Sequence, residues 1–379
     1  MSKQNILTTV IALIPLSYIL GNFALNLNIF FIILSGIFLY KKGERLKLHI
    51  IDKLIIIFFL YIIFTGIWNI LESYYFQKIQ NYDFSIIVKS FLFLRYILLY
   101  FSIRLIVEKN LINYKVLFCS FGFFSLFVST DIIFQFFYGK DFFGLTSPLV
   151  NKLTGPFHTE AIAGGFIQKF SFFLLFGFML LAKFNNFKIK ISILTILFFI
   201  TISSIILSGN RMSLFLFLLA ISLVFINNKT LKKYTLHIFV SIVLMLTIII
   251  NVNDSIKNYY YGFYKASKSI LSAYSYQILG YENYISYKSK HTYLHEFESG
   301  VSTWKLNKYI GGGLKSFRYN CPKRKIESIN TRTTCNMHPH NYYLEILTDL
   351  GIVGMLFFLS IMILVIKKSY NLLHDERFK

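Results

Sequence analysis

The sequence ISILTILFFITISSIIL at residues 191–207 contains no charged residue, and neither does LHIFVSIVLMLTIII at residues 236–250. A helix needs about 17–25 predominantly apolar residues to cross a bilayer, so both stretches predict transmembrane helices. The whole 379-residue chain has the same character, because 55% of its residues are hydrophobic and only 15% are charged. Soluble proteins carry about 25% charged residues, and disordered chains have low hydrophobicity. The composition therefore excludes both classes and predicts a membrane protein with several spans.

We expect an all-α polytopic membrane protein with about ten transmembrane helices and one large extracytoplasmic loop that carries short helices. The helices are predicted near residues 6–21, 24–40, 54–71, 86–107, 116–137, 161–182, 191–208, 212–226, 235–252 and 350–366. The first two are interpreted as full spans, with a re-entrant pair as the alternative. The chain then divides into residues 1–252, with nine helices and an outer loop at 138–160, the large periplasmic loop at 253–339, and residues 340–379. The last part holds the end of that loop, the final helix and a cytoplasmic tail.

The distribution of lysine and arginine indicates which side of the membrane each loop faces. If the N-terminus is cytoplasmic, the cytoplasmic segments hold 18 of these residues and the short outer loops hold only four. Cytoplasmic loops of membrane proteins carry an excess of Lys and Arg. We therefore expect both termini in the cytoplasm. Much of the formal net charge of +22 then reflects topology, and nucleic acid is not needed as a partner.

The segment at residues 252–339 is basic for a different reason. It holds 13 Lys and Arg residues against five Asp and Glu residues. Long translocated segments do not follow the orientation rule, so topology does not explain this surplus. It predicts attraction to an anionic group on the outer side of the membrane. Binding to anionic lipid headgroups is the alternative.

Two cysteines, Cys321 and Cys335, lie fourteen residues apart in the same loop. Outside the cytoplasm such a pair usually forms a disulfide. A metal site that also uses His338 and His340 is the alternative, but the spacing lacks the closely paired ligands typical of zinc sites. No Asp-x-Asp pair occurs in the outer loops. We expect a disulfide, and neither a metal nor another cofactor.

Two of the arginines within or beside the predicted spans are candidates for binding the charge of a ligand. Arg95 is near the middle of its span, where an arginine costs about 2.5–3.5 kcal/mol on insertion scales. We expect it to face a polar cavity and to bind the negative charge of a ligand. Arg211 follows Ser208-Gly209-Asn210 in a tight outer turn, where a guanidinium presents a fork of donors to phosphate oxygens. An interfacial anchor is the alternative for Arg211.

The segment NMHPHNYYLEILTDLGIVG at residues 336–354 is the most informative about chemistry. Pro339 suits the first turn of a helix, so a helix should start near His340 and run continuously into the last span. The first turn of a helix binds anions, and histidine suits general-base catalysis near neutral pH. Asn341, Glu345 and Asp349 recur every four residues. This stripe either orients the histidine or is the hydrated face of the helix. The combination favours a reaction with a phosphate-type leaving group.

Four groups of residues in this sequence carry a family resemblance. They are His340-Asn341 with Tyr343-Leu344-Glu345 and Leu350-Gly351-x-x-Gly354; Asp131 to Gln135 with Gly139-Lys140-Asp141; Gly155-Pro156-Phe157 with Glu160 and Gly164-Gly165; and Gly311 to Arg318 with Cys321 and Cys335. Together they resemble the O-antigen ligase/polymerase family, whose members are polytopic inner-membrane glycosyltransferases of the C-type superfold. They occur in the family's order over roughly residues 130–356.

The resemblance implies a metal-independent, inverting transfer of a glycan from polyprenyl pyrophosphate at the periplasmic face of the bacterial inner membrane. His340 would activate the acceptor hydroxyl, and Arg211 would hold the donor's pyrophosphate. The implied partners are a polyprenyl-pyrophosphate-linked glycan, a lipid A-core or glycan acceptor, and membrane lipids. We favour a ligase that uses a lipid A-core-type acceptor. A polymerase with the same site is the alternative, and a glycan-lipid flippase or exporter is the alternative of another class.

The family's second essential arginine has no match in this sequence. Near Trp304 the corresponding position is Val301. The cations that are candidates to replace it are Lys288, Lys290, His291, Lys315 and Arg318. His338, Asn341 and Glu345 would support His340 from behind. The tyrosines at 259–261 form either a sugar-stacking surface or part of an interfacial aromatic belt.

Overall fold

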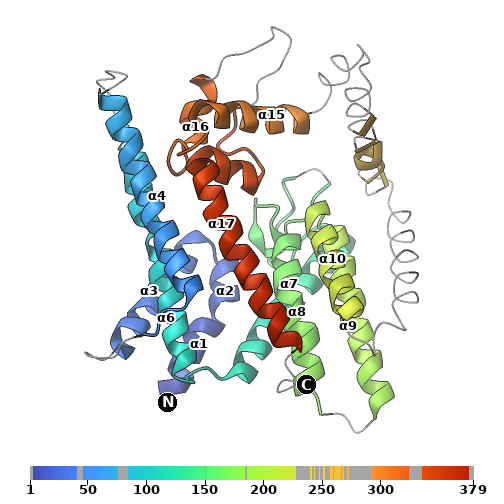
Figure 1. Cartoon of the computed structure of the whole chain (residues 1–379). Helices are drawn as coiled ribbons and strands as arrows, with labels where there is room; N and C mark the ends of the chain where they lie inside the picture. The colour runs from blue at the N-terminus through green and yellow to red at the C-terminus, as the bar shows by residue number, and fades with distance from the viewer. Residues whose placement is uncertain are drawn as a thin grey trace. The chain divides into compact units, whose positions relative to one another are not determined.

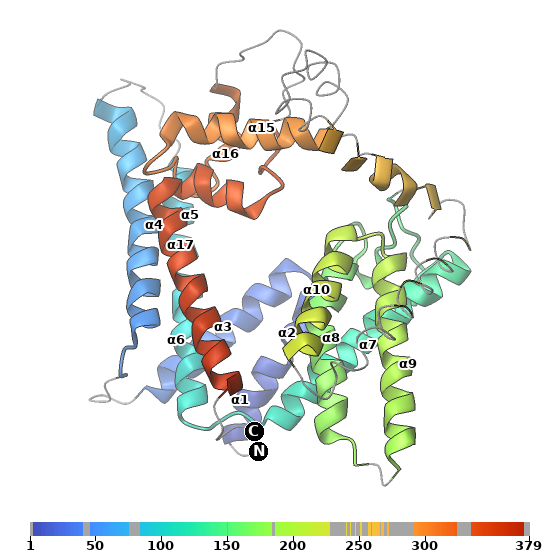
Figure 2. The same ribbon diagram turned by 45° about the vertical axis from the view of Figure 1, so that its right-hand side comes forward.

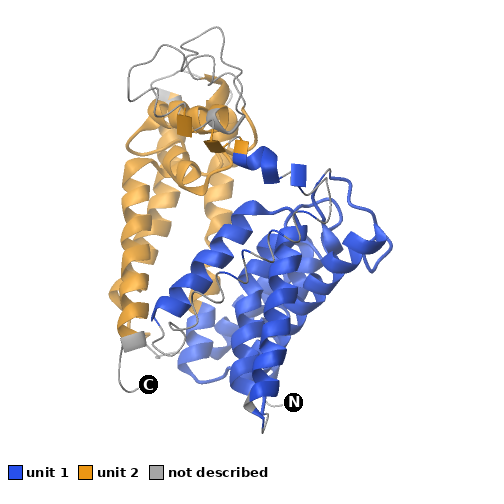
Figure 3. Cartoon of the chain, turned by 90° about the vertical axis from the view of Figure 1, so that its right-hand side faces the viewer, with its two compact units in different colours: residues 1–41, 102–264 blue, residues 42–101, 265–379 orange. Residues whose placement is uncertain are grey.

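The computed structural model describes residues 3–40, 46–75, 84–149, 151–183, 186–227, 292–323 and 335–374, together with scattered residues between 240 and 272. Every regular element in these ranges is a helix, as the sequence predicts. The chain forms two compact units, drawn in different colours in Figure 3. Unit 1 comprises residues 1–41 and 102–264, and unit 2 comprises residues 42–101 and 265–379. The division of the chain at residues 252 and 339 stays a prediction about membrane topology.

Seven of the described helices are long and apolar enough to cross a membrane, so the expected number of ten is not confirmed. Residues 6–21, expected as one span, form α1 (Lys3–Ala12) and α2 (Ile14–Ile19). Pro15 lies in the first turn of α2, and its missing N–H interrupts the helical hydrogen bonds. The helix α10 (Arg211–Asn227) is apolar but has only 17 residues. The span expected at 235–252 lies mostly outside the described residues.

Unit 1 is built around three long helices. They are α7 (Tyr114–Tyr138), α8 (Ala163–Leu181) and α9 (Phe187–Leu207). α1 and α2 pack against α7, α10 packs against α8 and α9, and α3 (Asn22–Leu39) packs against α1 and α2 (Figures 1 and 2). The core between them contains fully buried Val128, Ile132, Phe166 and Phe217. A Cβ atom at Gly122 of α7 would lie 3.0 Å from the backbone of Leu174 in α8. The absence of that atom lets the two helices approach closely, as small residues do in membrane proteins.

The outer loop between α7 and α8 is held by the polar residues of the sequence motif. The Asp131 carboxylate accepts a hydrogen bond from the Phe142 backbone N–H at 2.6 Å. Asp141 accepts from the backbone N–H groups of Phe143 and Leu145. Gln135 accepts from the Gly155 N–H at 2.9 Å, at the start of the short helix η1 (Gly155–Phe157). These motif residues therefore fold the loop onto the end of α7.

Unit 2 contains α4 (Ile50–Tyr75), α5 (Ser85–Phe93), the first half of α6 (Arg95–Glu108) and the C-terminal helix α17 (Tyr342–His374). α4 packs against α17, and the Tyr61 hydroxyl of α4 donates to the carbonyl oxygens of Ile310 and Leu350, both at 3.1 Å. The helix α15 (Thr292–Trp304) lies across the N-terminal end of α17 (Figures 1 and 2). This crossing brings two distant segments together where the candidate site lies.

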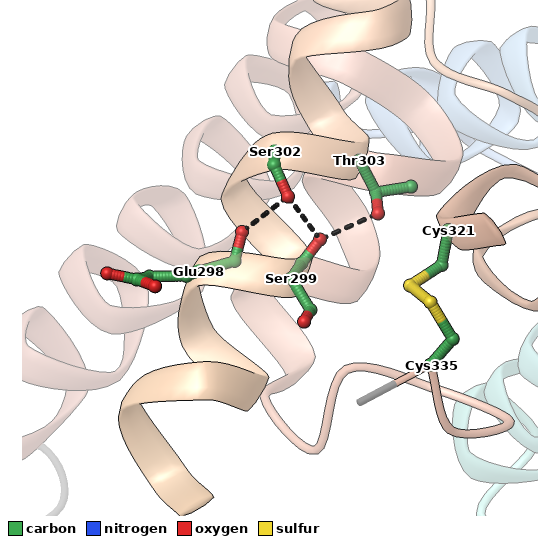
Figure 4. The surroundings of a disulfide bond; sticks show 6 residues. All are labelled: Glu298, Ser299, Ser302, Thr303, Cys321 and Cys335. Carbon is green, nitrogen blue, oxygen red and sulfur yellow. Dashed lines mark hydrogen bonds between the residues drawn. A yellow bond between two sulfur atoms is a disulfide. The ribbon is translucent and has the colours of Figure 1, made fainter. Parts of the chain in front are cut away.

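A disulfide joins Cys321 to Cys335, which is the pairing expected from the sequence. Cys321 begins the short helix η3 (Cys321–Lys323), directly after α16 (Phe317–Asn320). Figure 4 shows the disulfide beside Ser299 and Thr303 of α15. The bond fixes the beginning of the segment that leads to α17. Because both sulfur atoms are used in it, the alternative metal site would have no thiolate ligands.

Candidate active site

His340 lies immediately before the N-terminus of α17. The helix begins at Tyr342, and the Asn341 side chain caps it by accepting from the backbone N–H groups of Tyr343 and Leu344 at 3.0 and 3.2 Å. His340 itself has a left-handed backbone with φ of 50°. The expectation that His340 belongs to the first helical turn is therefore wrong. The cap at Asn341 sets the start of the helix, because its side chain satisfies N–H groups that have no partner within the helix.

Glu296 of α15 faces the His340 ring. Its carboxylate Oε1 lies 4.0 Å from His340 Nε2 and also accepts a hydrogen bond from the Asn336 amide at 3.2 Å. The His340 side chain is 47% exposed, whereas that of Glu296 is only 17% exposed. The His338 ring lies beside it, with the two ring centroids 4.4 Å apart. The arrangement is an accessible imidazole with a more buried carboxylate behind it.

Sequence reasoning missed Glu296. Its position 44 residues before His340 gives no indication of contact, since the two meet only where α15 crosses α17. A weak signal was present, because Glu296 is one of five acidic residues in a segment with 13 basic ones. An acidic side chain kept within a strongly basic loop is a candidate for a specific partner.

The loop Gly311-Gly312-Gly313, here called the glycine loop, forms backbone hydrogen bonds with α17 at a break in that helix. The Gly312 and Gly313 N–H groups donate to the carbonyl oxygens of Thr348 and Asp349 at 2.9 and 2.8 Å. In the opposite direction, the Ile352 N–H donates to the Lys308 carbonyl at 2.9 Å. These exchanges are possible because Gly351 has non-helical angles, φ 66° and ψ −168°. The predicted continuous helix is therefore interrupted, and its freed backbone groups bind the loop.

The predicted polar stripe has three separate structural roles. Asn341 caps the helix, and Glu345 forms an ion pair with the Lys315 ammonium group. Asp349 is only 3% exposed, so it does not belong to a hydrated face. Its carboxylate accepts from the Lys315 and Ser316 backbone N–H groups at 2.7 and 3.2 Å. The stripe therefore holds the glycine loop in place beside the start of α17.

The cations expected to bind pyrophosphate in unit 2 have different surroundings. Lys315 already pairs with Glu345, which offsets its charge. Arg318, in α16, has a buried Nε atom with no hydrogen-bond partner among the described residues. Arg95 stacks on Tyr96, with its guanidinium 4.9 Å from the ring centroid, and donates to the Tyr96 hydroxyl at 3.0 Å. His291 lies outside the described residues, as do Lys288 and Lys290.

Arg211 is the first residue of α10 in unit 1. The turn before it contains Gly209 with φ of 70°, a left-handed conformation that glycine adopts without steric cost. The Arg211 guanidinium lies over the Phe263 ring, 4.8 Å from its centroid. A guanidinium on an aromatic face keeps donors at its edge for a phosphate. Arg211 and His340 belong to different units, so their convergence on one pocket stays a prediction.

Comparison with known proteins gives one match. The family model described as O-antigen ligase matches residues 196–359, a range that contains Arg211, Glu296, the glycine loop and His340. No curated protein and no solved structure matches the chain. The matched range contains two of the four groups of residues that carry the resemblance, those at 311–335 and 340–354, whereas the groups at 131–141 and 155–165 lie before it. The match at residues 196–359 supports the resemblance of this membrane protein to the O-antigen ligase/polymerase family, whose members are glycosyltransferase-type enzymes.

Proposed function

We propose that the protein is an O-antigen ligase-type glycosyltransferase. It transfers a glycan from polyprenyl pyrophosphate to a hydroxyl of a lipid A-core-type acceptor, with inversion at the anomeric carbon and without a metal ion. The reaction takes place at the periplasmic face of the bacterial inner membrane. The observation that carries the proposal is the exposed His340 imidazole backed by Glu296 at 4.0 Å, within a region that matches the ligase family.

His340 acts on the acceptor in this reaction. The acceptor hydroxyl oxygen attacks the anomeric carbon of the donor's first sugar, and one ring nitrogen of His340 takes the hydroxyl proton. The other nitrogen faces the Glu296 carboxylate, which stabilises the imidazolium as it forms. Asn336 helps to hold Glu296 in position through its amide hydrogen bond. The pair resembles a base and its orienting carboxylate in other enzymes.

Positively charged side chains stabilise the leaving group, which is the polyprenyl pyrophosphate. As the new carbon–oxygen bond forms, the bond between the anomeric carbon and the phosphate oxygen breaks, and its electron pair goes to the pyrophosphate. Arg211 holds this developing charge with bidentate hydrogen bonds. From unit 2, Arg318 is better suited than Lys315 to add a second positive charge, because Glu345 already pairs with Lys315.

The proposal is tested by reconstituting the full-length chain in lipid nanodiscs with a polyprenyl-pyrophosphate-linked glycan and a lipid A-core acceptor. We expect glycosylated lipid A-core and released polyprenyl pyrophosphate, and we expect the rate to persist in EDTA. Mass spectrometry of the lipid products measures both. Elongation of the carrier-linked glycan would instead identify a polymerase. In liposomes, movement of the donor across the bilayer without a new glycosidic bond would identify a flippase.

The substitution Glu296→Gln tests the role of the carboxylate. Two unit charges 4 Å apart interact by about 1 kcal/mol in water and by about 4 kcal/mol at an effective dielectric constant of 20. Since 1.36 kcal/mol corresponds to a factor of ten in rate, we expect kcat to fall by about tenfold or more. KM for the donor should change little, because Glu296 acts through His340 and not on the pyrophosphate.

Glu298→Gln is the matched control for this substitution. It removes the same charge from the same helix at a position two residues away, which points to a different side of α15. We expect kcat to stay within about twofold of the original value. Equal losses in the two variants would show that the effect is one of overall loop charge, and would contradict the Glu296–His340 pair.

A further inference from the structure

Unit 1 contains a cavity of about 320 Å³ that the proposed reaction does not yet use. It is lined by the C-terminal end of α7, by the outer loop between α7 and α8, and by the turn between α9 and α10. Gly209 of that turn is part of the lining, and Arg211 follows it two residues later. Two residues span at most about 7 Å of backbone, so the cavity lies close to the Arg211 position.

The walls of this cavity are held by specific contacts. The amide of Gln135, which is only 1% exposed, bonds to the Gly155 N–H and to the Leu145 carbonyl. A Cβ atom at Gly209 would lie 2.6 Å from the Asn151 carbonyl oxygen, so the outer loop packs directly on the turn. The Tyr260 hydroxyl donates to the Ile206 carbonyl at 3.2 Å and fixes a further wall. The cavity is therefore preformed, as small-molecule sites usually are.

The lining combines the groups that bind a sugar ring. Phe136 and Tyr260 provide aromatic surface for its C–H faces, and Thr146 and Asn151 provide a hydroxyl and an amide group for its hydroxyls. The volume is at the lower end of the range of about 300–1,000 Å³ for ligand pockets. By contrast, a second cavity in unit 1, of about 280 Å³ between α8, α9 and α10, is lined almost entirely by apolar side chains. That one suits a hydrocarbon chain, whereas the first suits a polar ring.

Lys152 is the one charged residue in the described lining of the first cavity. No partner of its ammonium group occurs in the part of the chain that the structure describes. The ammonium group has three donors and no acceptor, so it requires oxygen atoms from a ligand or from water. The hydroxyls or the carboxylate of a sugar have such oxygen atoms.

We propose that this cavity is a subsite for one sugar ring of the donor glycan, next to the pyrophosphate at Arg211, and that Lys152 donates hydrogen bonds to oxygen atoms of that ring. The inference rests on the proposed function, since it takes the donor to be a glycan on polyprenyl pyrophosphate. It adds a site that recognises the sugar, separate from the group that holds the phosphates.

The test measures binding of three probes to the full-length chain in nanodiscs. The probes are polyprenyl pyrophosphate alone, the same carrier with one N-acetylhexosamine, and the same carrier with one hexuronic acid. For Lys152→Gln we expect about tenfold weaker binding of the sugar-bearing carriers, as for the loss of a charged hydrogen bond. Binding of the bare carrier should change less than twofold. A larger loss with the hexuronic acid would identify a carboxylate as the partner of Lys152, and equal losses would identify hydroxyls.

Lys140→Gln is the matched control, because Lys140 is an exposed lysine of the same outer loop that does not line the cavity. It should leave binding of all three probes unchanged. Equal weakening of the bare carrier by Lys152→Gln would assign Lys152 to the phosphates and overturn the sugar subsite, as would no weakening of any probe. Failure of the unsubstituted protein to bind any of the carriers would instead refute the proposed function.

Discussion

Replacing His340 with asparagine should lower the rate of glycan transfer by about 10²–10⁴-fold, the range that general-base catalysis contributes. Asparagine is the substitution that disturbs the backbone least. His340 has φ of 50°, and asparagine tolerates this left-handed backbone better than alanine does. The variant therefore keeps the turn before α17 and removes only the group that takes the proton. The measurement is the rate of product formation in nanodiscs with saturating donor and acceptor.

His158→Asn is the matched control for this variant. His158 is also an exposed histidine with a left-handed backbone, φ 54°, but it lies in the outer loop between α7 and α8. We expect the control to retain most of the activity, and both variants to bind the donor and to unfold at the original temperature. If His340→Asn kept more than a third of the original rate, the general-base mechanism would be refuted, and another group would have to take the proton of the acceptor hydroxyl.

Gly351→Ala should have the largest effect on stability, about 4 kcal/mol or more, which is exceptional for a single substitution. The angles φ 66° and ψ −168° belong to a region that only glycine populates, and other residues pay about 1–3 kcal/mol for it. A Cβ atom would also overlap the Tyr309 carbonyl oxygen, which is backbone and has no room to move. We expect a lower temperature of unfolding of the purified protein, with loss of transfer, since the glycine loop and the start of α17 depend on this break.

Gly144→Ala separates the two causes. Gly144 also has a left-handed backbone, with φ of 81°, but nothing lies within 4 Å of the position of its Cβ atom. The free energy of unfolding should therefore fall only by the cost of the left-handed backbone for alanine, about 1–2 kcal/mol. If Gly351→Ala were no less stable than Gly144→Ala, α17 would not require its break at this residue. The hydrogen bonds between residues 311–313 and α17 would then not contribute to the stability of the protein.

The sequence predicted the helical class well, but the number of spans less well. Hydropathy counts apolar residues and does not register whether backbone hydrogen bonds continue. The segment 6–21 illustrates this, because its apolar run is unbroken while Pro15 divides it into two short helices. The same limitation applies to α17, where an apolar and helix-compatible sequence contains a break that the partner loop at 311–313 stabilises.

At the candidate site, the sequence indicated residue types but not their partners. The helical spacing groups Asn341, Glu345 and Asp349, and all three do lie at the start of α17. Which of them cap, pair or become buried depends on what packs against each one. Asp349 is buried because the glycine loop covers it, and Glu345 is paired because the same loop brings Lys315 to it.

The amino-acid sequence alone determined that this chain is a helical membrane protein, that Cys321 and Cys335 pair, and that its C-terminal half carries an O-antigen ligase domain. These properties follow from composition, from short spacings and from local motifs. Only the tertiary structure decided that Glu296 faces His340, that α17 breaks at Gly351, and that a polar cavity lies beside the Arg211 turn. Each of these joins segments that are distant in the chain, and such contacts are selected by the free energy of packing between helices, which no local pattern of residues specifies.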